Sequence, residues 1–232
     1  LKRVKQPHQH TPFFWDILKE SKIENILIDL LGKDISLKTS KLNTKAPGGG
    51  AAVEWHQDWA FYPHTNDNVL ALGLMINDVD LDNGPLMVIP KSHKGPVLSH
   101  NNNGVFCGAI DPNDKNFDIS KAVTLTGKAR SMTIHHARTL HGSAPNNSNK
   151  DRLMLFYECN SADAWPLVGV GAYLNNTNPI DLCNQMERQM LCGNVSYQPR
   201  MESVPVVLPL PPAPDYGSIF TTQKTGGAKS AF

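Results

Sequence analysis

The chain has 232 residues, 40% of them hydrophobic, which is long enough for one domain with a substantial core. Its formal net charge of +1 gives no electrostatic reason to expect a nucleic-acid or anionic-membrane partner. No apolar stretch approaches the roughly 20 residues of a membrane-spanning helix.

A helical flank is predicted at the N-terminal end, over residues 1–33. Within it, residues 11–31 carry apolar side chains at helical spacing. Thr11 followed by Pro12 is a typical helix start, and Gly32 a typical stop. We expect one or two helices here.

Short β-strands are predicted through residues 34–160, separated by turn sequences such as PGGG at 47–50 and LDNG at 81–84. The predicted strand regions are 34–46, 51–61, 68–79, 85–92, 122–127, 131–139 and 152–160. Many short strands joined by turns favour a β-sandwich or barrel over alternating βαβ units.

Residues 161–232 are predicted to form a C-terminal extension of the same domain. A short helix is expected over 180–191, and the proline-rich segment 204–214 must be extended. The last twelve residues, from 221, are expected to be frayed.

The four cysteines form no CxxC pair, which favours free thiols in a reducing compartment. We therefore expect a cytoplasmic location. The sequence opens at Leu1 without a methionine, which leaves room for a removed leader.

A metal-binding pair is suggested by the segment EWHQDWAFYPH, residues 54–64. In a strand, His56 and Asp58 point to the same face because they are two residues apart. An imidazole and a carboxylate side by side are two of the three ligands of a metal site, and the third must come from elsewhere in the chain.

His141 is the predicted third ligand. It lies before a turn, in the segment HHARTLHGSAPNN. Two histidines and one carboxylate form the facial triad of non-haem Fe(II) oxygenases, which leaves three coordination positions open. His135 shares the expected face of His141 and competes for this role. We expect His135 and His136 to pack or to hydrogen-bond near the site, His93 to stabilise a loop, and His64 and His100 to lie on the surface.

Arg152 lies eleven residues after His141, on the next predicted strand. A guanidinium binds a carboxylate through two parallel hydrogen bonds, a geometry that lysine does not reproduce. Ser143 could add a hydroxyl to the same carboxylate.

Taken in order, the motifs WHQD, NGPLMVIPKSHKG, LHGSAPN and Arg152 resemble the phytanoyl-CoA dioxygenase (PhyH) family of Fe(II)/2-oxoglutarate-dependent oxygenases. The resemblance implies a single domain over 1–232, built on a double-stranded β-helix (a cupin-like jelly roll) with flanking α-helices. It implies that His56, Asp58 and His141 hold Fe(II), and that Arg152 and Ser143 bind the distal carboxylate of 2-oxoglutarate.

The activity implied by the resemblance is hydroxylation of a small-molecule C–H bond by O2, with release of succinate and CO2. We expect a small-molecule substrate and no nucleic-acid or membrane partner. Trp59, Phe61 and Arg138 are candidates for the substrate pocket, although core packing is the ordinary role of strand aromatics.

Two other functions remain open from the residues alone. Zinc accepts the same ligands, so a zinc-dependent hydrolase or a cupin-like isomerase is possible. A catalytically silent binding module on the same barrel is the other alternative.

Overall fold

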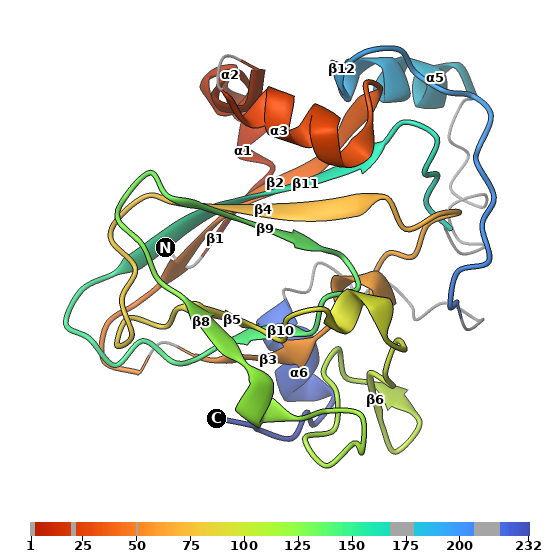
Figure 1. Ribbon diagram of the computed structural model, residues 1–232. Helices are drawn as coiled ribbons and strands as arrows, with labels where there is room; N and C mark the ends of the chain where they lie inside the picture. The colour runs from red at the N-terminus through yellow and green to blue at the C-terminus, as the bar shows by residue number, and fades with distance from the viewer. Residues whose placement is uncertain (1–2, 20–21, 50, 168–178, 207–218) are drawn as a thin grey trace.

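The computed structural model describes residues 3–19, 22–49, 51–167, 179–206 and 219–232. Two antiparallel sheets lie one above the other, and helices cover the upper sheet (Figure 1). This is the mainly β, double-stranded β-helix architecture that the sequence predicted.

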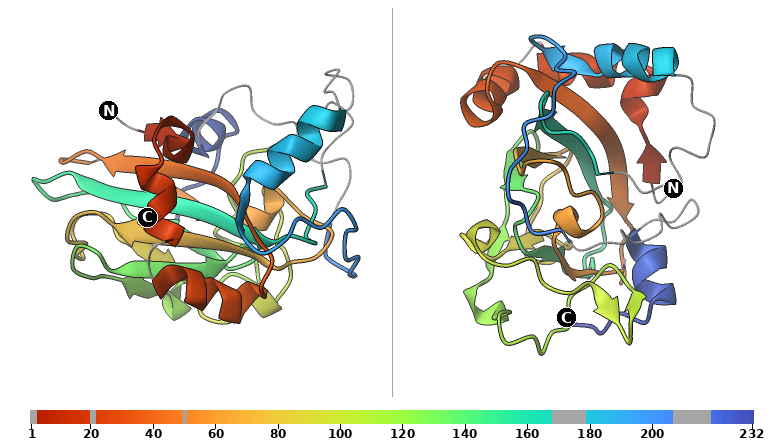
Figure 2. Two further views of the ribbon diagram at one scale, coloured as in Figure 1. Left: turned by 90° about the horizontal axis from the view of Figure 1, so that it is seen from above. Right: turned by 90° about the vertical axis from the view of Figure 1, so that its right-hand side faces the viewer.

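Three helices of the N-terminal flank lie across the outer face of the larger sheet (Figure 2). They are α1 (Pro7–His10), α2 (Phe13–Lys19) and α3 (Lys22–Leu31). Gly32 ends α3 as predicted: it adopts a positive φ of 91°, which glycine tolerates without a steric penalty, and its amide donates to the Ile28 carbonyl.

The larger sheet has six strands, all in antiparallel pairs. In spatial order they are β1 (Arg3–Lys5), β2 (Ile35–Lys45), β11 (Arg152–Ser161), β4 (Val69–Met75) and β9 (Met132–His136), with β12 (Met190–Cys192) also paired to β2. The long strands β2 and β11 dominate this sheet and fall where the sequence placed them.

The smaller sheet has four strands and lies below the larger one (Figure 1). Its order is β3 (Val53–His56), β10 (His141–Ser143), β5 (Leu86–Val88) and β8 (Val123–Leu125). A separate two-stranded sheet pairs β6 (Asn101–Asn102) with β7 (Val105–Phe106). Single 3-10 turns occur at Asp58–Ala60, Ser92–Lys94 and Ile119–Lys121.

The main hydrophobic core lies between the helices and the outer face of the larger sheet. Alternate residues of β2 and β11 face the helices, so Leu37, Leu155 and Tyr157 are almost completely buried against Leu18 and Leu27. These apolar side chains of β2 and β11 therefore pack on the outer face of the sheet.

The opposite, inner face of the larger sheet is rich in polar and charged residues. Cross-strand partners on this face include Arg152 with Lys45 and Glu158 with Thr39. A β-bulge interrupts the ladder, because Glu158 pairs with Thr39 but Cys159 pairs with Leu37, so that Lys38 is the extra residue.

The C-terminal part adds α5 (Pro179–Arg188), as predicted, and α6 (Ile219–Thr225). The expectation of a frayed end was wrong. The Gln223 side chain is buried and hydrogen-bonds to the backbone of Glu54 and Gly108, which ties α6 to β3. Most of the proline-rich segment 204–214 lies outside the described residues. Among the described helices, none combines the length and apolar character needed to cross a bilayer.

Candidate metal centre

His56 and Asp58 come from the end of β3, but not from one continuous strand as the sequence suggested. His56 is the last residue of β3, Gln57 is still extended, and Asp58 begins a 3-10 turn. The extended backbone at Gln57 preserves the alternation for one more residue. The imidazole and the carboxylate therefore still point to the same side.

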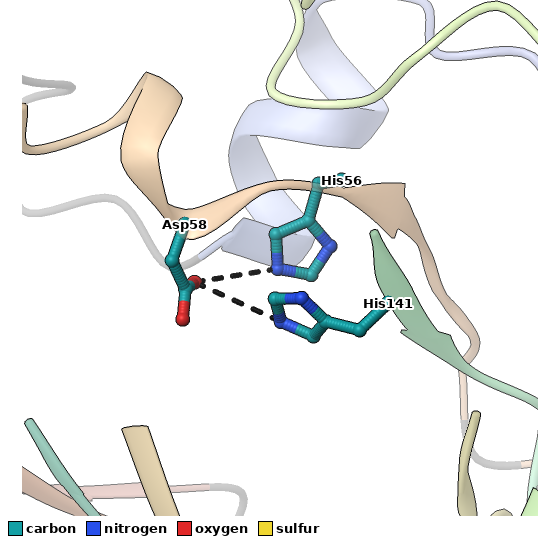
Figure 3. A group of neighbouring side chains, drawn as sticks. All are labelled: His56, Asp58 and His141. Carbon is teal, nitrogen blue, oxygen red and sulfur yellow. Dashed lines mark ion pairs between the residues drawn. The ribbon is translucent and has the colours of Figure 1, made fainter. Parts of the chain in front are cut away.

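His141 is the first residue of β10 and the direct cross-strand partner of His56. Their ring centroids lie 4.1 Å apart, and both rings point toward Asp58 (Figure 3). The Asp58 Oδ1 atom is 3.6 Å from His56 Nε2 and 3.8 Å from His141 Nε2. The three residues are buried, and one ligand atom of each lies within 4.8 Å of the other two.

The tautomer of each imidazole suits a metal ligand. His56 Nδ1 is 2.8 Å from the Glu54 carbonyl, and His141 Nδ1 is 2.9 Å from the Thr139 carbonyl. Each carbonyl accepts a hydrogen bond, so Nδ1 carries the proton and Nε2 is left with a lone pair directed at the site. His100 shows the contrast, because its Nε2 accepts a hydrogen bond from the Gln57 amide.

Electrostatics hold Asp58 and His141 in the ionisation states that a divalent cation requires. Burial opposes the charged form of Asp58, but the adjacent His141, His135 and His56 side chains keep its pKa well below the usual range. Burial, followed by repulsion from His56, lowers the pKa of His141 well below its ordinary value. An ionised carboxylate and a neutral imidazole are donors of the kind that the facial triad uses.

His135 lies next to this group on β9 rather than within it. Its Nε2 is 3.7 Å from Asp58 Oδ2, and its ring centroid is 4.5 Å from that of His141. Neither ring nitrogen has a hydrogen-bond partner among the described residues. His136 points to the other face, where its Nε2 is 3.9 Å from Asp67.

A cavity of about 350 Å³ adjoins the three residues and lies between the two sheets. Arg152 and Ser143 both line it, Arg152 from β11 and Ser143 from β10. Arg152 is only 4% exposed, and its Nε has no hydrogen-bond partner among the described residues. Burial lowers the pKa of Arg152 to about 10, so the side chain remains a cation at neutral pH and is available to an anion.

Lys45 is a buried lysine beside Arg152 that the sequence did not indicate as part of the site. It is the cross-strand partner of Arg152, and its Nζ donates to the carbonyls of Ser143 and Ala144. Burial, reinforced by repulsion from Arg152, lowers the pKa of Lys45 to about 6. Lys45 is therefore largely neutral at pH 7 and fixes the backbone of β10.

Of the three predicted pocket residues, the structure places one at the cavity and two away from it. Phe61 lines the cavity and packs edge-on against the His56 ring. Trp59 is instead part of the core, where its indole N–H donates to the Pro205 carbonyl. Arg138 bonds to Asp67 and to the Gly95 carbonyl, away from the described lining of the cavity. Trp59 was a candidate because it directly follows Asp58, but it packs with Val69 and Ala137, so proximity in the sequence did not bring it to the cavity.

Several residues of the cavity wall escaped the sequence analysis. The inner face of β1, β2 and β11 contributes Arg3, Thr39, Lys41, Asn43 and Glu158, and α6 contributes Phe220. Alternation along β2 could have selected the odd-numbered residues from 39 to 45, but only once the burial of that face was known. His64 and His100 were also misjudged, since both are buried.

Comparison with known proteins matches most of the chain to one family. A sequence model of the family described as Phytanoyl-CoA dioxygenase (PhyH) matches residues 1–154. The chain is 40% identical over 228 residues to a probable alpha-ketoglutarate-dependent hypophosphite dioxygenase of Stutzerimonas stutzeri, covering 97% of this chain and 76% of that protein.

Two further matches are more distant. An ectoine dioxygenase of Bordetella bronchiseptica is 24% identical over 181 residues, which is 67% of this chain and 56% of that protein. The chain therefore spans little more than half of this relative. The solved structure of the non-heme monooxygenase ThoJ, in its apo form, superimposes with a TM-score of 0.65 at 17% identity, covering 87% of this chain and 71% of that one. At this identity the likeness supports the fold alone.

Proposed function

This chain belongs to the phytanoyl-CoA dioxygenase family, and from that premise we propose that it hydroxylates a small molecule at the site between its two sheets. It is a non-haem iron dioxygenase whose cofactors are Fe(II), 2-oxoglutarate and O2. The observation that carries the proposal is the convergence of His56, Asp58 and His141 opposite the buried Arg152.

In the proposed site, His56, Asp58 and His141 would hold the iron through two Nε2 atoms and one carboxylate oxygen. Arg152 would bind the distal carboxylate of 2-oxoglutarate, with the Ser143 hydroxyl beside it. When bound, the iron with 2-oxoglutarate supplies the oxidation: one oxygen atom of O2 enters succinate as CO2 leaves, and the other converts a substrate X–H bond to X–OH.

The protein's own contribution is position and exclusion of water. The Nδ1 hydrogen bonds of both histidines fix the ring orientations, which limits the reorganisation needed on metal binding. Phe61 and Phe156 line the cavity and keep bulk water from the reacting bond.

Two kinds of substrate bond are candidates for the hydroxylation. The family resemblance points to a C–H bond of a small metabolite. Oxidation of a P–H bond, as in hypophosphite, is the second candidate, because the 40% identical relative bears that name and matches nearly the whole chain. Incubation with Fe(II), 2-oxoglutarate and either hypophosphite, ectoine or L-proline, with succinate measured, separates the two. Phosphite is detected by phosphorus NMR.

The cofactor assignment is tested without a substrate. Anaerobic addition of Fe(II) and then 2-oxoglutarate should produce a visible charge-transfer band, because the keto and C1-carboxylate oxygens chelate the iron. Zn(II) gives no such band and serves as the control. If no band forms, a zinc-dependent hydrolase or a silent binding module becomes the better account.

A further inference from the structure

A group of four charged residues lies on the inner face of the larger sheet. Three of them, Arg3, Lys41 and Glu158, line the cavity, and the fourth, Lys38, lies outside the described lining with its Nζ over the Tyr62 ring. We call Arg3, Lys38, Lys41 and Glu158 the Glu158 cluster. The Glu158 side chain is 4% exposed and forms an ion pair with Lys41 at 2.7 Å. Arg3 and Lys38 also lie within its electrostatic influence. Three cations surround one carboxylate, so two positive charges are uncompensated within the cluster.

Two of these cations have buried nitrogen atoms without hydrogen-bond partners among the described residues: Arg3 at Nε and Lys38 at Nζ. Lys38 Nζ lies 3.7 Å from the ring centroid of Tyr62, a residue that lines the cavity. Burial, and then the charges of Asp58 and Glu158, raise the pKa of Tyr62 well above its usual range, so the phenol stays neutral. A buried cation left without an anionic partner is costly, and such groups are typical of a site that receives one.

The β-bulge explains why Lys38 reaches this face. Leu37 belongs to the outer core and Thr39 lines the cavity, so a regular strand would leave no residue between them. The extra residue in β2 brings a second long side chain to the inner side, where its ammonium group lies over Tyr62. Bulges commonly redirect a side chain beside an active site.

Within the cluster, Glu158 is level with the predicted metal-binding residues rather than with Arg152. Across the larger sheet, Glu158 pairs with Ala71, which in turn pairs with His135, whose ring contacts Asp58. Arg152 lies six residues earlier on β11, roughly 20 Å away along the strand. Glu158 is thus far from the end of the cavity that would hold the distal carboxylate of 2-oxoglutarate. Arg3 starts nearer to that end, because it pairs with Asn43 on β2, but Glu158 is the charge that acts on its guanidinium.

Charge compensation differs between the part of the cavity near Arg152 and the part near Glu158. On the proposed function, Asp58 and the C1 carboxylate of 2-oxoglutarate compensate Fe(II), and the distal carboxylate compensates Arg152. Lys45 is largely neutral because its pKa is about 6. Within the Glu158 cluster, Arg3 and Lys38 then remain without a compensating negative charge. Burial lowers the pKa of Lys38 to about 8, which still leaves it charged at pH 7.

We propose that the substrate is a small oxyanion, that Arg3 binds its charged oxygens from the cavity wall, and that Lys38 adds a second positive charge from behind the Tyr62 ring, while Lys41 and Glu158 hold the two cations in place. This inference rests on the proposed function and names the substrate class of the same site. The cavity, at about 350 Å³, is near the lower end of the roughly 300–1,000 Å³ typical of ligand pockets. It must also hold 2-oxoglutarate, so the remaining room suits a substrate of few atoms. Hypophosphite belongs to this class.

The test compares anions with a neutral molecule of similar size. The anaerobic Fe(II)/2-oxoglutarate complex is titrated with hypophosphite, methylphosphonate, acetate and dimethyl sulfoxide, and the perturbation of the charge-transfer band gives each dissociation constant. At least one anion should bind at least ten times more tightly than dimethyl sulfoxide. The anion that binds best distinguishes a phosphorus oxyanion from a carboxylate.

Two variants assign the binding to the cluster. Lys38→Met and Arg3→Gln should each raise the dissociation constant of the preferred anion at least tenfold, while 2-oxoglutarate affinity changes less than twofold. Lys38→Arg should retain part of the anion affinity. The matched control is Lys128→Met, a lysine whose side chain is 88% exposed, and it should behave as the wild type.

Three results would overturn the inference: equal affinity for anions and dimethyl sulfoxide, no effect of either variant, or a larger loss of 2-oxoglutarate affinity than of anion affinity. The last result would assign the cluster to the cosubstrate. If a variant does not fold, the wild-type panel decides alone. Failure of the proposed function appears separately, as absence of the band. In that case thermal unfolding of the metal-free protein with each anion still reports on the cluster, which should be stabilised by the preferred anion.

Discussion

The two faces of the larger sheet are made by the same strands and have opposite characters. On the outer face of β11, Leu155 and Tyr157 are almost completely buried against the helices. On the inner face, the alternate residues Arg152 and Glu158 are equally buried but charged. Hydrophobic burial on one face stabilises the fold and so permits unpaired charges on the other. Substitutions on the two faces should therefore affect stability and ligand binding separately.

The largest effect is expected from the predicted metal-binding carboxylate, Asp58. Asp58→Ala should reduce 2-oxoglutarate-dependent succinate formation at least about 1,000-fold, because two imidazoles alone do not retain Fe(II). Iron content after desalting and succinate release check this. Asp78→Ala, at a carboxylate whose side chain is 54% exposed, is the control and should retain activity. More than a tenth of wild-type activity in Asp58→Ala would refute the ligand assignment.

The next largest effect is on stability, from the outer face. Leu155→Ala should lower the free energy of unfolding by about 3 kcal/mol, since it removes a side chain with no exposed surface from the main core. Phe156→Ala, its neighbour on the inner face, should cost less stability and alter ligand binding more. Urea unfolding and 2-oxoglutarate titration of both variants give the comparison. Equal losses of stability would contradict the separation of the two faces.

A smaller effect is expected at the cosubstrate end. Arg152→Lys keeps the charge but loses the two parallel hydrogen bonds to a carboxylate, so the KM for 2-oxoglutarate should rise about 30-fold, or ~2 kcal/mol. Steady-state succinate assays measure it. Arg188→Lys, at an exposed position on α5, is the control. An unchanged KM would mean that the distal carboxylate binds elsewhere.

The smallest effect is a pH dependence of stability at Lys45. Its pKa is about 6 in the folded protein, because of burial and then Arg152, against 10.5 as the ordinary value, with Glu54 opposing the shift. Between these values the unfolded chain binds one more proton, so this residue makes stability rise with pH. In the metal-free protein, the free energy of unfolding of the wild type should rise relative to that of Lys45→Met by about 1 kcal/mol per pH unit from pH 7 to 9. A constant difference would show that Lys45 titrates normally.

The parts of the fold that were predictable are those encoded by local patterns. The long strands β2, β4 and β11 have continuous β-forming sequences, and the N-terminal helices have clear periodicity and a glycine stop. Strand β10 was not predicted, because three residues of sequence His-Gly-Ser have no intrinsic strand preference and are held by neighbours on both sides. Its formation depends on tertiary pairing.

For the site, the sequence brought together His56, Asp58, His141 and Arg152, and the structure places all four around one cavity. Their ligand roles stay predictions. The Glu158 cluster was not visible in the sequence, since its members are spread from residue 3 to residue 158 and a bulge changes the facing of one of them. Likewise, the role of α6 depends on hydrogen bonds from Gln223 that no local pattern announces.

The bulge at Lys38 also bears on how such a protein can change over generations. It divides the pairing of β2 with β11 into two segments, each with its own complete set of partners. Loss of the single codon for Lys38 would bring Leu37 and Thr39 next to each other opposite Cys159 and Glu158, and the ladder would become continuous. A gene can therefore acquire or discard this ammonium group through a change of one residue in length, while the predicted iron-binding residues and the apolar core keep their positions.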